Sequence, residues 1–228
     1  MAKKKAKKPK WNFREGDKGL ITKSSLTNAL IKLLRSPAVQ SINFVFNAII
    51  VSGSRMAELA RAIEKFEIIV YHDTKCAIVP GKFDGYYSAT DDALYLGFDD
   101  LAPIDNRMLA LHECVHAISD IHGSAGITKL DDECAGYVAC ALYYRHAGHK
   151  YPKRPKATLP LVDAIYQAAF NLADAYLDKV ANPNNEVQAM RAAILAVPIY
   201  KSAAKVTMAY NGLNHKMRSG EYALAASL

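Results

Sequence analysis

The sequence predicts an α+β fold in which a small antiparallel sheet packs on a pair of helices, with additional N- and C-terminal helices. Three observations indicate this fold class. Short β-branched segments gather between residues 67 and 96, a periodic apolar pattern begins at Pro103, and residues 160–228 are rich in alanine. The chain has 228 residues, which is enough to bury a substantial core without disulfides.

The positive charge is concentrated at the start of the chain. The formal net charge is +7, and residues 1–10 (MAKKKAKKPK) hold six lysines and no acid, so the remainder is nearly neutral. We expect residues 1–20 to form a disordered basic tail, because so charged a segment cannot offset its ordering entropy by burial. Residues 3–10 are the place where an anionic partner, nucleic acid or a membrane surface, would bind.

No secretory signal or membrane span is expected. The basic start is followed by Trp11 and a polar stretch rather than by an apolar segment. The apolar run over residues 39–51 is interrupted by four polar side chains and is too short to cross a bilayer. We therefore expect a cytoplasmic protein with reduced cysteines, while export without a cleavable signal would leave no mark on the composition.

The first half of the chain predicts two short helices and a small sheet. Residues 26–35 predict an amphipathic helix that ends before Pro37, and Ser54 is a candidate N-cap for a helix over residues 55–66. Strands are expected over residues 67–72, 75–79, 86–87 and 93–96. The last two flank a polar turn and should form a hairpin.

Two longer helices should follow. The first carries one apolar stripe with alternating spacings of four and three residues: Ile104, Met108, Leu111, Val115 and Ile118. Thr128 and Asp131 resemble a capping box that begins a second helix, which runs to about residue 144. We assign residues 21–150 to one metal-binding domain and residues 151–228 to a helical C-terminal region packed on it.

The segment His112-Glu113-Cys114-Val115-His116 has the residue types and spacing of a metal site. On an α-helix, His112 and His116 lie about 40° apart on one face, with Glu113 beside them at about 100°. Two neutral imidazoles can hold one metal ion, and a glutamate beside them can act as a general base toward a water molecule on that ion. The pattern predicts a zinc site.

A zinc site of this type needs a third protein ligand. His122 has the spacing of the pattern H-E-x-x-H-x-x-G-x-x-H, but Ser119 occupies the glycine position, and a continuous helix would turn His122 away. Glu133 would approach the histidines if the second helix packs antiparallel to the first. We favour Glu133 as the third ligand, with Asp132 and His122 as alternatives.

The stretches LALHECVHAISDIHG and DDECAGYVACALYY resemble the core of the gluzincin branch of zincin metallopeptidases. The resemblance covers about residues 67–145 and implies a zincin-like fold in which His112, His116 and Glu133 bind Zn²⁺. The family carries an aspartate four residues after its glutamate ligand, where this chain has Tyr137. The acid that supports the ligands must therefore differ, and we expect it to be Asp120.

This resemblance implies zinc-dependent hydrolysis of peptide bonds by a metal-activated water, with Glu113 as the general base. Tyr137 shares the helical face of Glu133 and is the expected oxyanion partner, and Tyr86 or Tyr87 could reach the site from the sheet. The substrate would be a peptide or a protein. Two alternatives stay open: a zincin-fold binding or regulatory protein that meets nucleic acid through its lysine tail, and an exported effector or toxin protease.

Overall fold

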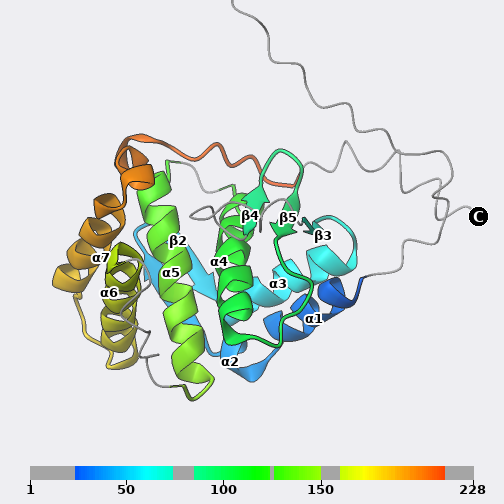
Figure 1. Ribbon diagram of the computed structural model, residues 1–228, viewed down its shortest axis with the longest axis horizontal. Coiled ribbons are helices and arrows are strands. Elements are labelled where there is room, and N and C mark those ends of the chain that lie inside the picture. The colour runs from blue at the N-terminus through cyan, green and yellow to red at the C-terminus, as the bar shows by residue number, and fades with distance from the viewer. Residues whose placement is uncertain (1–23, 74–84, 124–125, 150–159, 214–228) are drawn as a thin grey trace, which may run out of the picture.

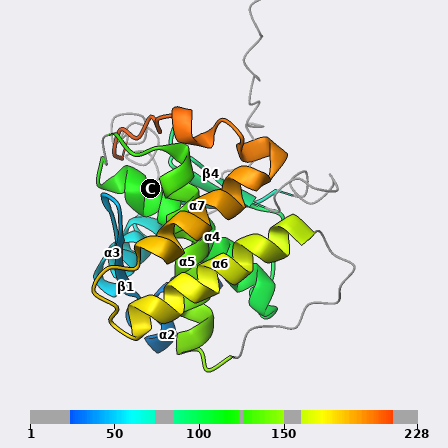
Figure 2. The ribbon, with the colours of Figure 1, turned by 90° about the vertical axis from the view of Figure 1, so that its left-hand side faces the viewer.

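Two long helices, α4 (Ile104–Ile121) and α5 (Lys129–His146), lie side by side at the centre of the protein (Figure 1). The computed structural model describes residues 24–73, 85–123, 126–149 and 160–213. Within these residues the fold is mixed α and β. The N-terminal helices over residues 25–34 and 53–64 contact α4, and the C-terminal helices cover α5 (Figures 1 and 2).

The N-terminal helices begin at serine caps. Ser24 accepts a hydrogen bond from the Thr27 amide at the start of α1 (Ser25–Leu34), and α2 (Pro37–Gln40) follows directly. The cap of α3 (Gly53–Glu64) is Ser52, two residues before the predicted Ser54. The helix starts there because the Ser52 hydroxyl accepts a hydrogen bond from the Arg55 amide. A Cβ on Gly53 would come within 2.2 Å of the Gln40 carbonyl oxygen in α2, which explains the glycine.

The apolar run over residues 39–51 contains a hairpin that the sequence analysis missed. Strand β1 (Asn43–Phe46) pairs antiparallel with β2 (Ile49–Ser52), and Asn47 makes the turn with a φ of 53°. Burial alternates along both strands, which places Phe44 and Phe46 in the core and Val45 at the surface. No helix among the described residues is both long enough and apolar enough to cross a membrane.

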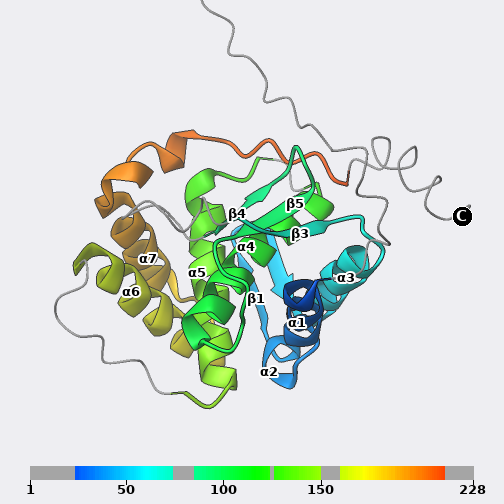
Figure 3. The ribbon, with the colours of Figure 1, turned by 45° about the vertical axis from the view of Figure 1, so that its right-hand side comes forward.

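The second sheet contains three strands in the order β3-β5-β4 (Figure 3). Strands β4 (Gly85–Ser88) and β5 (Ala93–Leu96) form the predicted antiparallel hairpin. Strand β3 (Ile69–His72) is parallel to β5, so the prediction of a purely antiparallel sheet is wrong. This parallel pairing sets Val70 beside Leu94 in the core. The strand predicted over residues 75–79 lies outside the described residues.

Helix α4 buries the predicted apolar stripe almost completely from Met108 onward. Helix α5 is buried on all sides along most of its length. Every residue from Leu130 to Tyr144 is buried, because α4, α6, α7 and the β1–β2 hairpin surround α5. Three consecutive acids, Asp131, Asp132 and Glu133, are therefore buried in its first turns, and each needs a partner.

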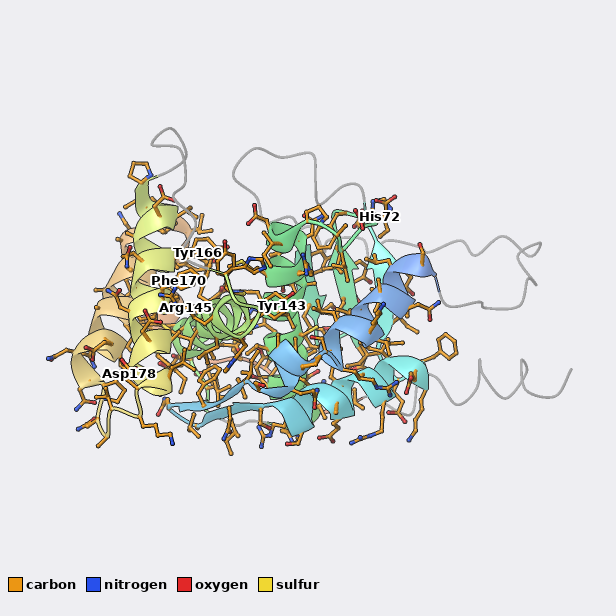
Figure 4. All side chains as sticks on the ribbon, turned by 90° about the horizontal axis from the view of Figure 1, so that it is seen from below. His72, Tyr143, Arg145, Tyr166, Phe170 and Asp178 are labelled. Carbon is orange, nitrogen blue, oxygen red and sulfur yellow. The ribbon has the colours of Figure 1, made fainter. Side chains whose placement is uncertain are left out.

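The C-terminal helices α6 (Pro160–Leu177) and α7 (Asn184–Ala196) lie across α5 (Figure 2). Where α5 and α6 meet, Arg145 forms a two-bond ion pair with Asp174, at 2.6 and 2.7 Å, and its guanidinium lies over the Phe170 ring (Figure 4). The predicted helical character of this region is confirmed over these two elements. Short 3-10 turns follow at Pro198–Tyr200 and Ala203–Lys205.

After these turns the chain runs back along the top of the helix pair toward β4 and β5 (Figure 1). We call residues 206–212 the C-terminal strap. Its first half pairs with the segment before α5, since the Lys129 amide donates to the Val206 carbonyl at 2.7 Å and the Met208 amide donates to the Ile127 carbonyl at 2.9 Å. The strap thereby lies beside the helix ends that carry the candidate site.

Candidate metal centre

A buried cluster of His112, Glu113 and His116 lies on α4 with the spacing H-E-x-x-H. One ligand atom from each residue lies within 4.8 Å of the other two, so the group could hold a metal ion. The two imidazole rings meet edge to face, with their centroids 4.8 Å apart. Among the described residues, no other group of histidine, cysteine and acidic side chains has this geometry.

His116 is held by Asp132 from the first turn of α5. Its Nδ1 lies 2.6 Å from Asp132 Oδ2, and the Tyr210 hydroxyl donates to the same carboxylate oxygen. Burial opposes the protonation of His116, but the Asp132 carboxylate outweighs it and raises the pKa to about 10 in the absence of a metal ion. Because Asp132 occupies Nδ1, the nitrogen left for a metal is Nε2.

His112 meets the other acid of the pair, Glu133. His112 Nε2 and Glu133 Oε2 are 3.2 Å apart, and the Tyr200 hydroxyl donates to the same oxygen, also at 3.2 Å. Two ligand atoms at about 2.0–2.2 Å from one tetrahedral zinc ion lie roughly 3.3–3.5 Å from each other. The His112–Glu133 separation therefore fits one edge of such a site.

Glu113 lies beside the two histidines and faces the sheet. Its Oε2 accepts a hydrogen bond of 3.0 Å from the Tyr87 amide on β4, which fixes the orientation of the carboxylate. Burial raises the pKa of Glu113, an effect that the neighbouring His116 and His112 partly oppose. The carboxylate is thus oriented and more basic than an exposed glutamate, as a proton acceptor requires.

A glycine allows α5 to approach His112. A Cβ on Gly136 would lie 2.7 Å from both Cε1 and Nδ1 of the His112 ring, closer than a real contact permits. Gly136 is in the middle of a helix, where glycine costs about 1 kcal/mol relative to alanine. The close approach explains why glycine stands there, and it brings Glu133 within reach of α4.

Two residues weighed as ligands or supports lie elsewhere. His122 follows the end of α4 and contacts Glu58 of α3 at 3.3 Å, away from the cluster. Asp120 accepts a hydrogen bond from the Tyr87 hydroxyl at 2.7 Å and from the strap amides of Asn211 and Gly212. The expectation that Asp120 supports a histidine is wrong in this structure. Asp132 makes that contact instead.

Tyr137, the predicted oxyanion partner, packs against the cluster from behind. Its ring meets His112 edge to face with centroids 4.6 Å apart, and its hydroxyl is hydrogen-bonded to Tyr200. Tyr137 is not among the residues that line the pocket in front of the histidines, whereas Tyr200 is. Tyr200 therefore lies at the pocket in place of Tyr137, and Tyr86 and Tyr87, the other tyrosines that were considered, line it as well.

The cluster opens into a pocket of about 380 Å³ between β4, the two central helices and the strap. Tyr86, Tyr87 and Thr90 line it from the sheet side, and Met208 and Tyr210 line it from the strap. Tyr200 and Tyr210 belong to the region in which the sequence analysis found no chemistry. Their hydroxyls reach Glu133 and Asp132 only because the chain returns over the site, and no spacing in the sequence signals this return.

Comparison with models of protein families, with curated proteins and with solved structures gives no match to this chain. The geometry of the site is therefore the basis for a proposed function. That geometry establishes a buried His-Glu-His group that could hold a metal ion.

Proposed function

We propose that this protein is a zinc-dependent hydrolase of peptide bonds with a zincin-like site of the gluzincin type. The observation that carries the proposal is the position of Glu113. It lies within the histidine cluster, faces the pocket and is held by the Tyr87 amide. A metal that served only to hold the fold would need no basic carboxylate beside it.

His112, His116 and Glu133 would hold the ion. This set of two nitrogens and one carboxylate oxygen is one that zinc prefers, and it leaves one coordination position open for water or substrate. Zinc supplies Lewis-acid chemistry, since it lowers the pKa of a coordinated water and polarises a carbonyl group. Asp132 would support the arrangement by holding the Nδ1 side of the His116 ring, which leaves Nε2 toward the ion.

Glu113 would accept the proton of the attacking water and later deliver it to the leaving amine. Its raised pKa favours both transfers, because a general base works best when its pKa is close to the working pH. The Tyr87 amide occupies Oε2, which leaves the second carboxylate oxygen for the proton.

Tyr200 replaces Tyr137 as the candidate donor to the developing oxyanion. Burial and the Glu133 carboxylate raise the pKa of Tyr200, so its hydroxyl keeps its proton. That proton is donated to Glu133 in this structure, and it would turn to the oxyanion once this Glu133 oxygen bound the ion. Preorganised donors of this kind are among the larger contributions to acyl-transfer catalysis. A peptide is the favoured substrate because the pocket adjoins β4, an edge strand of its sheet, and extended peptides commonly bind beside sheet edges.

Replacement of Glu113 by glutamine tests the proposal. Hydrolysis of a mixed peptide library should fall by about a hundred- to ten-thousand-fold at equal zinc content, because glutamine keeps the shape but cannot accept the proton. Glu58→Gln on α3 is the matched control, and it should retain the wild-type rate. Zinc-loaded wild-type protein that cleaves no peptide would instead support the binding or regulatory alternative, whose lysine-rich residues 3–10 lie outside the described residues.

A further inference from the structure

Lys129 is the one lysine or arginine among the described residues that line the pocket. It is the first residue of α5, and its Nζ lies 5.8 Å from the centroid of the Tyr200 ring. The other charged side chains of the lining are the carboxylates Glu113, Asp132 and Glu133 and the two histidines. The pocket thus has a cation at the Tyr200 side of the candidate metal cluster.

The position of Lys129 is explained neither by an ion pair nor by helix stability. None of the carboxylates in the described part of the chain forms an ion pair with it, although three of them line the same pocket. Its location also opposes the helix dipole, because a cation in the first turn of a helix lies at the positive end. The ammonium group lies over the Tyr200 ring, a cation–π contact that keeps it at the wall of the pocket, where it can also meet a ligand.

We propose that Lys129 binds a carboxylate of the substrate, so that the preferred substrates are peptides with a carboxylate next to the bond that is cleaved. This inference rests on the proposed peptidase function. A pocket lined by three carboxylates repels a negatively charged peptide, so a dedicated cation is needed if such a peptide is to bind. The carboxylate has two chemical sources, the C-terminus of the peptide or an aspartate or glutamate side chain.

Two matched pairs of peptides distinguish these sources. One pair differs only in a free or amidated C-terminus, and a second pair differs only in glutamate or glutamine beside the cleaved bond. For wild-type protein we expect kcat/KM to be about 10-fold higher for the carboxylate member of one pair, the size typical of one charge-assisted hydrogen bond. Lys129→Met should bring that ratio close to one, and Lys129→Arg should keep it. Lys205→Met, on the exposed turn before the strap, is the control and should also keep it.

A binding measurement separates this inference from the proposed function. The same peptides are titrated onto zinc-loaded Glu113→Gln protein, in which cleavage is not needed for a signal. We expect the carboxylate peptide to bind about 10-fold more tightly than its neutral partner, with a preference that weakens as salt increases. If the wild type cleaves nothing but this preference depends on Lys129, the peptidase proposal fails and the carboxylate site stands. Equal binding of both members of each pair, or a preference that survives Lys129→Met, would overturn the inference.

Discussion

Two consecutive acids on α5, Asp132 and Glu133, meet the two histidines of α4 in different ways. Glu133 approaches Nε2 of His112, the nitrogen that would face a metal, whereas Asp132 approaches Nδ1 of His116. Successive residues of a helix point about 100° apart, so neighbouring acids can reach different sides of the same site. Glu133 is therefore the acid proposed as a ligand, and Asp132 the acid proposed as a support.

This difference predicts how ligand substitutions rank. Glu133→Ala should weaken zinc binding far more than His122→Ala, because Glu133 lies 3.2 Å from His112 while His122 pairs with Glu58 on another helix. Competition with a chelator measures both affinities. Equal losses, or a larger loss for His122→Ala, would mean that His122 is the third ligand.

Tyr210 gives a second prediction at the level of single residues. Its hydroxyl donates to the oxygen of Asp132 that contacts His116, so Tyr210→Phe should let Asp132 and the imidazole move. Partners of ligands commonly affect metal affinity by about 10- to 100-fold, and we expect up to about 10-fold for this more distant group. Tyr87→Phe is the control, because the hydroxyl of Tyr87 bonds Asp120 and not a histidine support. Equal zinc affinity of the two variants would contradict this role of the Tyr210 hydroxyl.

At the level of elements, the contact between α4 and α5 determines whether the site forms. Gly136→Ala should weaken zinc binding and destabilise the fold by about 1–3 kcal/mol, because the new methyl group collides with the His112 ring. Chemical denaturation of the metal-free protein measures the stability. In His112→Ala the ring is absent, so adding Gly136→Ala to that variant should cost little. If Gly136→Ala lowers the stability as much in the His112→Ala background as it does alone, the new methyl group collides with something other than the His112 ring.

The two central helices and the β4–β5 hairpin could be predicted because their signals are local. Thr128 caps α5 as expected, with its hydroxyl accepting from the Asp131 amide, and the apolar stripe of α4 is buried. The β1–β2 hairpin was missed because its alternation of buried and exposed residues lies inside a generally apolar run. The parallel pairing of β3 with β5 depends on how distant strands meet, which no local pattern encodes.

At the level of the whole molecule, the C-terminal region completes the site. Tyr200 and Tyr210 contact acids that precede them by 67 and 78 residues, so only the tertiary path of the chain brings them there. The H-E-x-x-H cluster was recognisable because it needs only helical spacing, and the position of Glu133 beside His112 needs one packing contact more. The role of Glu133 as a ligand stays a prediction. The division into residues 21–150 and 151–228, the cytoplasmic location and the role of residues 3–10 stay predictions.

The metal content of the purified protein tests the central claim most directly. Elemental analysis of the wild-type chain should give one zinc per molecule, and His112→Ala should have lost it, while Glu58→Ala keeps it because Glu58 lies on α3 away from the cluster. Binding through three protein ligands should also survive extensive dialysis against metal-free buffer. Wild-type protein that carries no metal as purified and takes up none on dialysis against zinc would contradict the account.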